Sequence, residues 1–265
     1  MKKQLLKTLA AGVLVSALCL TSCGNSGSKM IEIPEMIEIP GKDFKMSATE
    51  ITQKQYEKVM GENPSWFKLS NGYLKDGEKK QLKNTSNNPV EKVSWYDAIY
   101  FCNKLSKEKG RTPVYAVDGN TDVTTWNYTP HQESKIEGEI TQDLTANGFR
   151  LPTVGEWRYA ARGGQNYTYS GSDNLDEVGW YGKNSGYRTH PVAQKKANGY
   201  GLYDMSGNVW EWCWDVYPDR SDYHYDCGGS YRYRDSCCEV SYRDGWNASN
   251  QDDFVGFRIV CSSSK

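Results

Sequence analysis

The stretch from Gly228 to Arg258 constrains this chain more than any other, because two short, recognisable segments enclose irregular sequence. The stretch begins with Gly228-Gly229-Ser230 and ends with Gly256-Phe257-Arg258. Aromatic and charged residues follow one another irregularly between these ends. Such a mixture is typical of a binding surface held at both ends by fixed structure, and it does not resemble a working active site.

The residues inside this stretch suit contact with a ligand. Tyr, Trp and Phe provide large, fairly rigid surfaces at low entropic cost, and Arg and Asp provide directional polar contacts. Exposed apolar side chains usually mark an interaction site, and we predict that Tyr233, Tyr242 and Trp246 are exposed. For Tyr231 and Phe254, burial in the core is an equal alternative. The predicted ligand-binding residues are Tyr231, Arg232, Tyr233, Arg234, Asp235, Cys237, Tyr242, Asp244, Gly245, Trp246, Asn247, Ser249, Asn250, Asp252, Asp253 and Phe254.

Residues 1–22 have the composition of a lipoprotein signal peptide. Three lysines precede a mostly apolar run from Leu9 to Leu20, and small polar residues lead to Cys23. The run is too short to span a bilayer permanently, and no later segment approaches the roughly 20 apolar residues that a span needs. We expect Cys23 to be lipidated, with residues 23–29 as a short linker to a soluble domain.

Residues 30–265 are expected to form one domain. The chain has 9 Trp and 19 Tyr, enough for one sizeable core. It has 32 Lys plus Arg against 33 Asp plus Glu, and removal of the leader would take away three lysines and no acids. An acidic mature domain argues against binding to nucleic acid.

The cysteines and histidines form no recognisable metal or catalytic motif. Of eight cysteines, Cys19 would leave with the leader and Cys23 would be lipidated, and disulfides are allowed among the other six in an oxidising compartment. The sequence has no CxxC pair, and adjacent Cys237 and Cys238 are poor joint ligands for zinc. The three histidines, His131, His190 and His224, lack ligand spacing and are expected to be solvated loop residues.

Capping residues predict three helices. The pairs are Thr52 with Gln55, Ser94 with Asp97, and Thr153 with Glu156, and the helices are expected to end at Gly61, Gly110 and Gly163-Gly164. The repeated Met-Ile-Glu-Ile-Pro at 30–34 and 36–40 suits an edge strand. Sequence after about Gly179 predicts short strands joined by long loops, and the fold class is therefore α+β.

Several longer motifs resemble the formylglycine-generating, or sulfatase-modifying-factor, family in their order and wording. They are Thr49-Glu50-Ile51-Thr52, Asn88-Pro89-Val90, Val93-Ser94-Trp95, Arg150-Leu151-Pro152-Thr153, Gly201 to Trp212, Gly228-Gly229-Ser230 and Gly256-Phe257-Arg258. The resemblance extends from about Met30 to Cys261. It implies that family's variant of the C-type lectin fold, with few regular elements and long loops.

Only one of the two copper-binding cysteines expected from the family resemblance is present in this chain. Family members that generate formylglycine have two cysteines after Gly-Gly-Ser that hold copper(I), an ion suited to soft thiolates. The matching positions here are Tyr233 and Cys238, and Tyr233 cannot supply a thiolate. Cys237 would point another way if the segment is extended. The chain is therefore expected not to be an enzyme, and the alternative is a copper-dependent oxidase acting through Cys238.

A second group of proteins resembles this chain where it differs from the formylglycine-generating enzymes. Gly-Gly-Ser-Tyr, Cys238-Glu239-Val240 with Arg243, and Gly-Phe-Arg resemble the variable proteins of diversity-generating retroelements, especially treponemal variable lipoproteins. In that class, adenines of selected codons, mostly asparagine codons, are randomised. Most residues between Arg232 and Phe254 outside the frame are reachable from an asparagine codon in this way, although Trp246 is not. The resemblance thus implies a variable region at 231–254.

The family resemblance also implies two structural features. The side chains matching Asp204 and Glu211, with the carbonyls matching Gly207 and Val209, hold calcium in the family, which prefers such oxygen ligands. A purely structural alternative has Trp210, Trp212 and Trp214 in the core and Asp204 binding loop amides. A family disulfide implies a bond between Cys102 and Cys261, although Cys261 lies two residues past the matching position; as the alternative, Cys102 is a small buried apolar residue. Pairing among Cys213, Cys227, Cys237 and Cys238 stays open.

The predicted function is that of a lipid-anchored binding protein of the cell envelope, at the outer membrane and exposed on the surface. Its diversified surface at 231–254 would bind a protein or glycan of a host or a neighbouring microbe. It would contact the membrane only through its lipid anchor. Such a role requires no cofactor beyond an implied structural calcium ion. A structural envelope lipoprotein without a discrete ligand is a third alternative.

Overall fold

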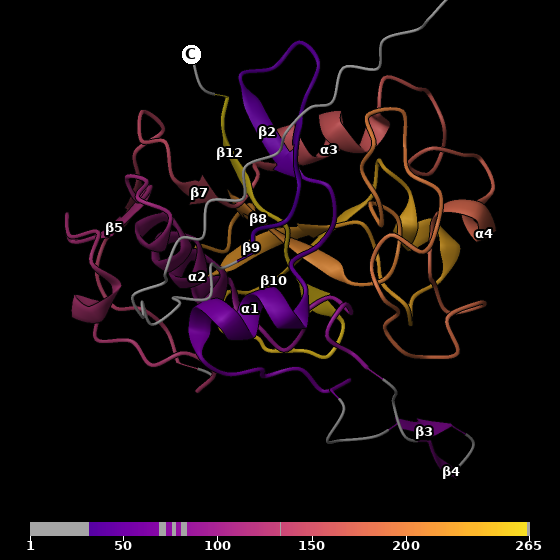
Figure 1. Cartoon of the computed structure of the whole chain (residues 1–265), viewed down its shortest axis with the longest axis horizontal. Helices are drawn as coiled ribbons and strands as arrows, with labels where there is room; N and C mark the ends of the chain where they lie inside the picture. The colour runs from indigo at the N-terminus through magenta and orange to yellow at the C-terminus, as the bar shows by residue number, and fades with distance from the viewer. Residues whose placement is uncertain (1–31, 69–72, 76–77, 81–83, 133, 264–265) are drawn as a thin grey trace, which may run out of the picture. The chain divides into compact units, whose positions relative to one another are not determined.

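The computed structural model describes residues 32–263 except 69–72, 76–77, 81–83 and 133 (Figure 1). The predicted signal peptide, Cys23 and the linker lie outside the described residues. Within the described part of the chain, no helix is both long and apolar enough to cross a membrane.

Short elements joined by long loops make up the α+β fold predicted from the sequence (Figure 1). The helices are α1 (Gln53–Met60), α2 (Trp95–Glu108), α3 (Val154–Arg162) and α4 (Leu175–Val178), with 3-10 turns η1 (Val123–Thr125) and η2 (Asp235–Cys238). The strands are β1 (Met36–Glu38), β2 (Phe44–Ser47), β3 (Tyr73–Lys75), β4 (Glu78–Lys80), β5 (Tyr115–Val117), β6 (Ile140–Gln142), β7 (Phe149–Arg150), β8 (Trp210–Val216), β9 (Tyr223–Cys227), β10 (Arg243–Asn247), β11 (Val255–Gly256) and β12 (Val260–Ser262).

Two four-stranded sheets carry most of the strand pairing. One has the order β1-β2-β12-β7, and the other has the order β10-β9-β8-β11, in which β11 runs parallel to β8. The pairs β3-β4 and β5-β6 are separate antiparallel hairpins. The second Met-Ile-Glu of the tandem repeat forms the edge strand β1, as predicted, whereas residues 32–35 before it form no strand.

All three predicted helix starts are confirmed as reciprocal capping boxes. Thr52, Ser94 and Thr153 each accept a hydrogen bond from the amide three residues on, and that residue's side chain returns one to the cap. Both orphan amides are satisfied locally, and the boxes could therefore be predicted without tertiary information. Helices α1 and α3 end where expected, at left-handed glycines 61 and 163, while α4 was not predicted.

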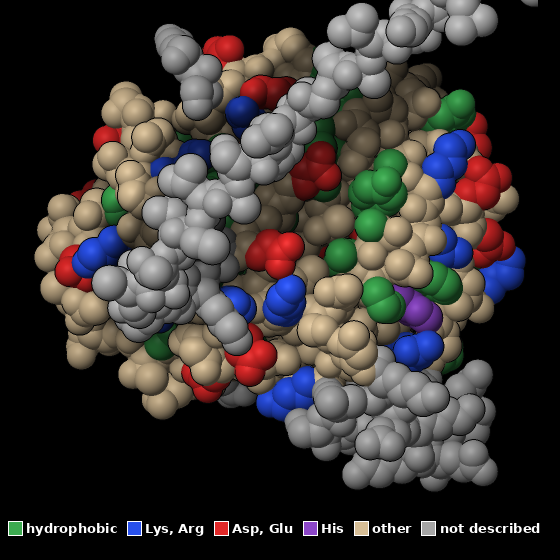
Figure 2. Space-filling model, in the orientation of Figure 1, with side chains coloured by type: hydrophobic (Ala, Val, Ile, Leu, Met, Phe, Trp, Pro, Cys, Tyr) green, Lys and Arg blue, Asp and Glu red, His purple; other side chains and the backbone are tan. Residues whose placement is uncertain are grey.

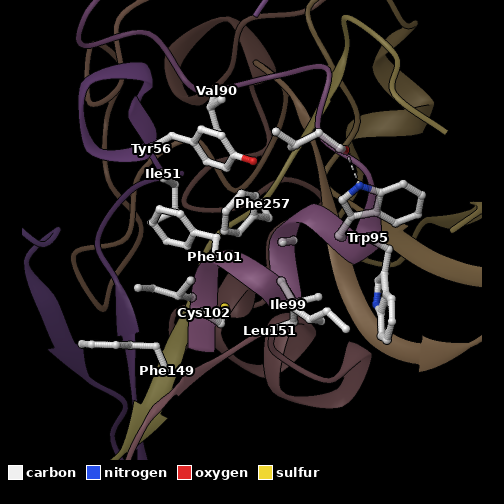
Figure 3. Packing of buried hydrophobic residues seen from close by; sticks show 14 of the residues in the cluster. Ile51, Tyr56, Val90, Trp95, Ile99, Phe101, Cys102, Phe149, Leu151 and Phe257 are labelled. Atoms are coloured by element: carbon white, nitrogen blue, oxygen red, sulfur yellow. Dashed lines mark hydrogen bonds between the residues drawn. The ribbon is translucent and has the colours of Figure 1, made fainter. Parts of the chain in front are cut away.

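The largest buried cluster joins α1 and α2 to the second sheet. Tyr56, Phe101 and Phe257 lie together in it, with Tyr56 and Phe101 stacked at a centroid distance of 5.3 Å (Figure 3). Trp212 is fully buried, and its indole donates to the Val93 carbonyl oxygen at 2.9 Å. The large aromatic content of the chain therefore goes mainly into one core that fixes the sheet from one side.

The Gly-Phe-Arg motif connects the two sheets through a buried ion pair. Arg258 is fully buried, and its Nε and Nη2 donate to Glu211 at 2.6 and 2.7 Å. The same guanidinium donates to the carbonyl oxygens of Ser47 and Tyr203. Trp157 of α3 donates to Glu211 at 2.6 Å. One buried carboxylate thus holds helix, sheet and loop in place.

The disulfide implied between Cys102 and Cys261 is not formed, because both residues are buried free thiols. The thiol of Cys261 lies near Arg111, Lys45 and Arg150. Cys213 and Cys227 lie on the paired strands β8 and β9, with 3.9 Å between their sulfur atoms. Both are also free thiols.

The expectation of solvated histidines was wrong for His224 and His190. His224 lies in β9, 7% exposed, and stacks on Trp95 with 3.8 Å between ring centroids. Burial lowers the pKa of His224 to about 4. His190 is half-buried and stacks on Trp180 at 3.8 Å, and burial likewise lowers its pKa to about 4. Both rings are therefore neutral packing elements at pH 7.

On the face shown in Figure 2, acidic and basic side chains are interspersed. No broad area of a single sign is visible among the described side chains of that face.

Candidate ligand-binding surface

The 231–254 surface, by which we mean residues 231 to 254, consists of η2, β10 and the loops around them. Strand β10 pairs antiparallel with β9, which places Trp246 opposite His224 and Asp244 opposite Asp226. Strand β9 pairs in turn with the long strand β8. The predicted site is therefore held by a sheet whose other strands belong to the core, which is how variable loops are kept in a fixed place.

Burial divides the predicted residues into an underside and an outer layer. Tyr231, Cys237 and Phe254 are 3%, 6% and 5% exposed, and they support the surface from below. For Tyr231 and Phe254 this agrees with the alternative of burial in the core, whereas burial of Cys237 disagrees with direct contact between that side chain and a ligand. Tyr233, Tyr242 and Trp246, predicted to be exposed, are half-buried. Exposed positions are Arg232, Arg234 and Asp235, and half-buried ones are Asp244, Gly245, Asn247, Ser249, Asn250, Asp252 and Asp253.

The aromatic rings of this surface form one connected group over Trp210. Tyr233 meets Trp210 edge-on at 5.6 Å and Phe254 at 5.5 Å. The ring centroid of Trp246 lies 5.6 Å from that of Phe254, and the ring centroid of Tyr242 lies 5.9 Å from that of Trp210. Such pairs add stability beyond their buried area. The partly exposed rings are thus anchored by buried ones, and the surface is preorganised.

Arg232 contributes an exposed, directed charge. Its guanidinium lies 5.0 Å from the centre of the Phe254 ring and 3.3 Å from a carboxylate oxygen of Asp253. Exposed pairs of this kind contribute little to stability. They do limit the orientations of the side chain, and Arg232 is therefore available for a ligand in a restricted geometry.

The two adjacent cysteines lie in η2 and not in the extended segment expected from the sequence. They still point apart, because Cys237 packs in the main core while Cys238 packs against Leu175, Val178 and Tyr181. Cys238 is fully buried, and burial raises the pKa of its thiol. A buried thiol with a raised pKa, packed against apolar side chains, is poorly suited to a two-thiolate copper site.

One acidic residue beneath the surface was missed. Asp226 of β9 is fully buried, and burial, followed by the nearby Asp244, raises the pKa of its carboxyl well above the usual range. A charged residue between Tyr225 and Cys227 inside a strand pattern was the available signal, since such residues are rarely buried unless paired. Between residues 222 and 254 the chain carries seven acids and three arginines.

Two clefts differ in their relation to this surface. A cleft of about 550 Å³ is lined by Asn247 and Ser249 together with Tyr96, Ser134, Lys135, Glu137 and Asp222. Tyr96 and Asp222 were not predicted, because only the fold brings them to β10. The larger cleft, about 1310 Å³, is lined by residues of β2, β7, α3 and the 144–147 loop. It contains none of the sixteen predicted residues.

Of the implied calcium ligands, the side chains of Asp204 and Glu211 lie near each other, and both lie near the positive charge of Arg258. Both oxygens of Glu211 accept hydrogen bonds from Arg258. Asp204 is buried, with one oxygen accepting from the Ala193 amide at 2.7 Å and the other without a partner. Burial raises the pKa of Asp204 to about 6. Among the described residues, no group of three or more His, Cys, Asp or Glu is arranged around a metal position.

Arg258 engages both oxygens of Glu211, and Asp204 keeps one carboxylate oxygen without a partner. Structural calcium at these residues stays a prediction, since calcium prefers several oxygen ligands. The structural alternative is observed in part, since Trp210 and Trp212 are core residues and Asp204 binds a loop amide.

Comparisons with known proteins agree with this architecture. Residues 20–263 match the sulfatase-modifying factor enzyme 1-like domain. Chaperone protein LppX of Paenibacillus barcinonensis is 35% identical over 292 aligned residues, covering 94% of this chain and 97% of that protein. The formylglycine-generating enzyme of Bos taurus is 28% identical over 82% of this chain and 65% of its own length. Treponema denticola variable protein 1 superposes with a TM-score of 0.73 at 33% identity, covering 87% of this chain and 92% of that chain.

Proposed function

Since this chain belongs to the sulfatase-modifying factor enzyme 1-like domain family, we propose that it is a non-catalytic member that uses the fold to present a ligand-binding surface at 231–254. The observation that carries the proposal is the connected aromatic group of Tyr233, Tyr242 and Trp246, half-buried and anchored on core residues. Preorganised aromatic anchors beside directional charges are what binding surfaces need.

The proposal includes diversification of this surface. Treponema denticola variable protein 1, similar over most of both chains, is variable by its name. The fold supports such variation, because the residues between the fixed ends are mostly half-buried or exposed, whereas the ends at Gly228 and Arg258 are buried. Substitutions between these ends cost less stability than substitutions in the core.

We further propose that Cys23 anchors the protein by lipid to the cell envelope, at the outer membrane with the domain exposed on the surface. The ligand would be a protein or glycan of a host or neighbouring microbe. A protein ligand is favoured by the relative that is named as a chaperone protein and covers nearly the whole chain.

Sequencing the gene and its flanking DNA from sibling isolates tests the function. We expect differences to concentrate between Arg232 and Phe254 and to fall on half-buried or exposed positions, next to a near-copy of this segment and a reverse transcriptase gene. The buried ends Gly228 and Arg258 serve as the internal control. Differences spread evenly over the domain, or an unchanging segment without a template copy, would contradict diversification.

The second candidate is a copper-dependent oxidase acting through Cys238, because this residue keeps one family position for copper. Against this candidate stand the burial of that thiol, which raises its pKa, and the family resemblance, which matches the second copper-binding cysteine to Tyr233. We expect copper(I) titration to reveal no tight site that depends on Cys238, and a cysteine-containing peptide to remain unconverted. Tight binding lost in Cys238→Ser but retained in Cys237→Ser, together with turnover, would establish the enzyme instead.

A further inference from the structure

A buried carboxylate without adequate partners lies directly below the 231–254 surface. Asp226 is fully buried, and among the described residues no side chain donates a hydrogen bond to either of its oxygens. The backbone amides of Asp226 itself and Asp244 lie beside the carboxylate without the geometry of a full hydrogen bond. Leaving a buried acid unsatisfied costs free energy, which a protein retains where a partner arrives from outside.

A second carboxylate lies beside it on the neighbouring strand. Asp244 is the antiparallel partner of Asp226, and directly opposite residues place their side chains on the same face of a sheet. Asp244 is half-buried. Two acids side by side repel each other unless a positive charge lies between or near them. Burial and Asp244 disfavour the charged form of Asp226, and a cation arriving beside the pair would favour it.

Aromatic rings surround this position. The pKa values of Tyr233 and Tyr242 are raised, mainly by burial, and Asp226 and Asp244 contribute to both shifts. Both phenols therefore lie close to the two acids. The buried ring of Trp210 packs against both phenol rings and supports them from the core side. Aromatic faces attract organic cations and ammonium or guanidinium groups, most strongly where the cation is desolvated.

Hydrogen-bond donors without acceptors lie in the same aromatic group. The indole nitrogens of Trp210 and Trp246 are buried and have no acceptor among the described residues. A bare metal ion could not satisfy them. A peptide brings carbonyl oxygens together with its side chains, and can therefore meet both the donors and the acids.

The charge of the region points to the same class of partner. Seven acids against three arginines between residues 222 and 254 give this part of the molecule a negative balance, and the stretch contains no lysine. A positively charged segment is attracted to such a region and is oriented by it before contact. The observations therefore agree on the sign of the ligand's charge and on its polypeptide nature.

We propose that Asp226 and Asp244, walled by Tyr233, Tyr242 and Trp210, form a subsite for the lysine or arginine side chain of a protein ligand. This inference rests on the proposed binding function of the 231–254 surface. The half-buried phenols rotate to admit the cation, which then pairs with Asp244 and reaches Asp226. A flanking peptide carbonyl of the ligand accepts from the indole group of Trp246, which belongs to the half-buried layer. Burial of the charge pair makes this subsite a dominant contributor to affinity.

The test uses small probes and the whole mature chain. N-acetyl-lysine amide and N-acetyl-arginine amide are titrated while the indole N–H resonances are followed by NMR, with N-acetyl-norleucine amide as the uncharged control. We expect weak, saturable binding of the charged probes that shifts Trp210 and Trp246. The uncharged probe should leave both resonances in place. Asp226→Asn and Asp244→Asn should each weaken binding of the charged probes about tenfold or more.

Matched variants distinguish binding from folding. Asp226→Asn removes a buried, unpaired acid, and its thermal midpoint should be equal to or above that of the parent chain. Asp219→Asn removes one exposed charge from the turn between β8 and β9, at a left-handed position that asparagine tolerates, and should bind the charged probes like the parent.

Other outcomes overturn the inference. Charged probes that bind Asp226→Asn and the parent equally, or that fail to shift either indole resonance up to their solubility limit, leave ordered water as the partner of Asp226. If sibling sequences vary at 231–254 while these probes fail, the proposed function stands and the cation subsite falls. If the probes bind but the segment is invariant, the subsite stands and diversification falls.

Discussion

Arg258→Met should lower the free energy of unfolding by about 4 kcal/mol, because removing one partner of a buried ion pair leaves an uncompensated charge. Arg258 is fully buried and pairs with Glu211. It lies near two further buried acids, Glu50 and Asp204. Burial, followed by the charges of Asp204 and Glu211, raises the pKa of Glu50 well above its usual range. The main charges of this buried cluster are therefore those of the ion pair between Glu211 and Arg258.

Denaturant unfolding and thermal melting measure this effect, and the midpoint should fall by about 10 °C or more for a domain of this size. Arg158→Met is the control, since Arg158 is only half-buried and lies on the same helix as Trp157, the other donor to Glu211. Adding Glu211→Leu to Arg258→Met should recover part of the lost stability, because the unpaired carboxylate is removed as well. A loss below about 1 kcal/mol in Arg258→Met would contradict a buried ion pair between Arg258 and Glu211.

The second large effect is expected from Gly256→Ala, two residues earlier. Gly256 lies in β11, and a Cβ there would approach the Val90 carbonyl oxygen to 2.3 Å and a methyl group of Val209 to 3.1 Å. The first contact is with backbone that is itself bonded into the structure, since the Val90 amide donates to Ile51. Relief requires separation of β11 from the 88–91 segment. We expect a loss of about 3 kcal/mol, at the upper end for overpacking.

Gly155→Ala is the matched control for the same chemical change. Gly155 is exposed in the first turn of α3, and its added Cβ would make only an ordinary contact of 3.8 Å with Thr153. Alanine is favoured over glycine in helices, so stability should be unchanged or raised by up to about 1 kcal/mol. Equal melting temperatures for Gly256→Ala and the parent chain would mean that β11 is not packed against Val90 as described.

The three residues of the Gly-Phe-Arg motif each have a structural role, which explains why the motif marks the end of the irregular stretch that begins at Gly228. Gly256 permits close approach of the backbone, Phe257 packs in the main core, and Arg258 satisfies Glu211. Each role depends on a partner from another part of the chain. Their identity was visible in the sequence through resemblance, whereas their function in the fold was not.

The candidate ligand-binding surface, like the Gly-Phe-Arg motif, was predicted only in part from the sequence. Its bounds and the mixture of aromatic and charged residues followed from the sequence, because composition and flanking motifs are local properties. The buried positions of Tyr231, Cys237 and Phe254 did not follow, since each depends on packing against the main core cluster from distant parts of the chain. The adjacent acids Asp226 and Asp244 come from different strands, and only the register of β9 with β10 joins them.

The sequence by itself determined the starts of α1, α2 and α3, since a capping box satisfies its donors within four residues. It also determined the fold class and the stretch that carries the candidate surface. Only the tertiary structure decided which acids are buried, which thiols approach one another and which rings reach solvent. These properties depend on the long-range pairing of β8, β9, β10 and β11. Burial and charge are set by what packs around a residue, and its neighbours in sequence do not fix that environment.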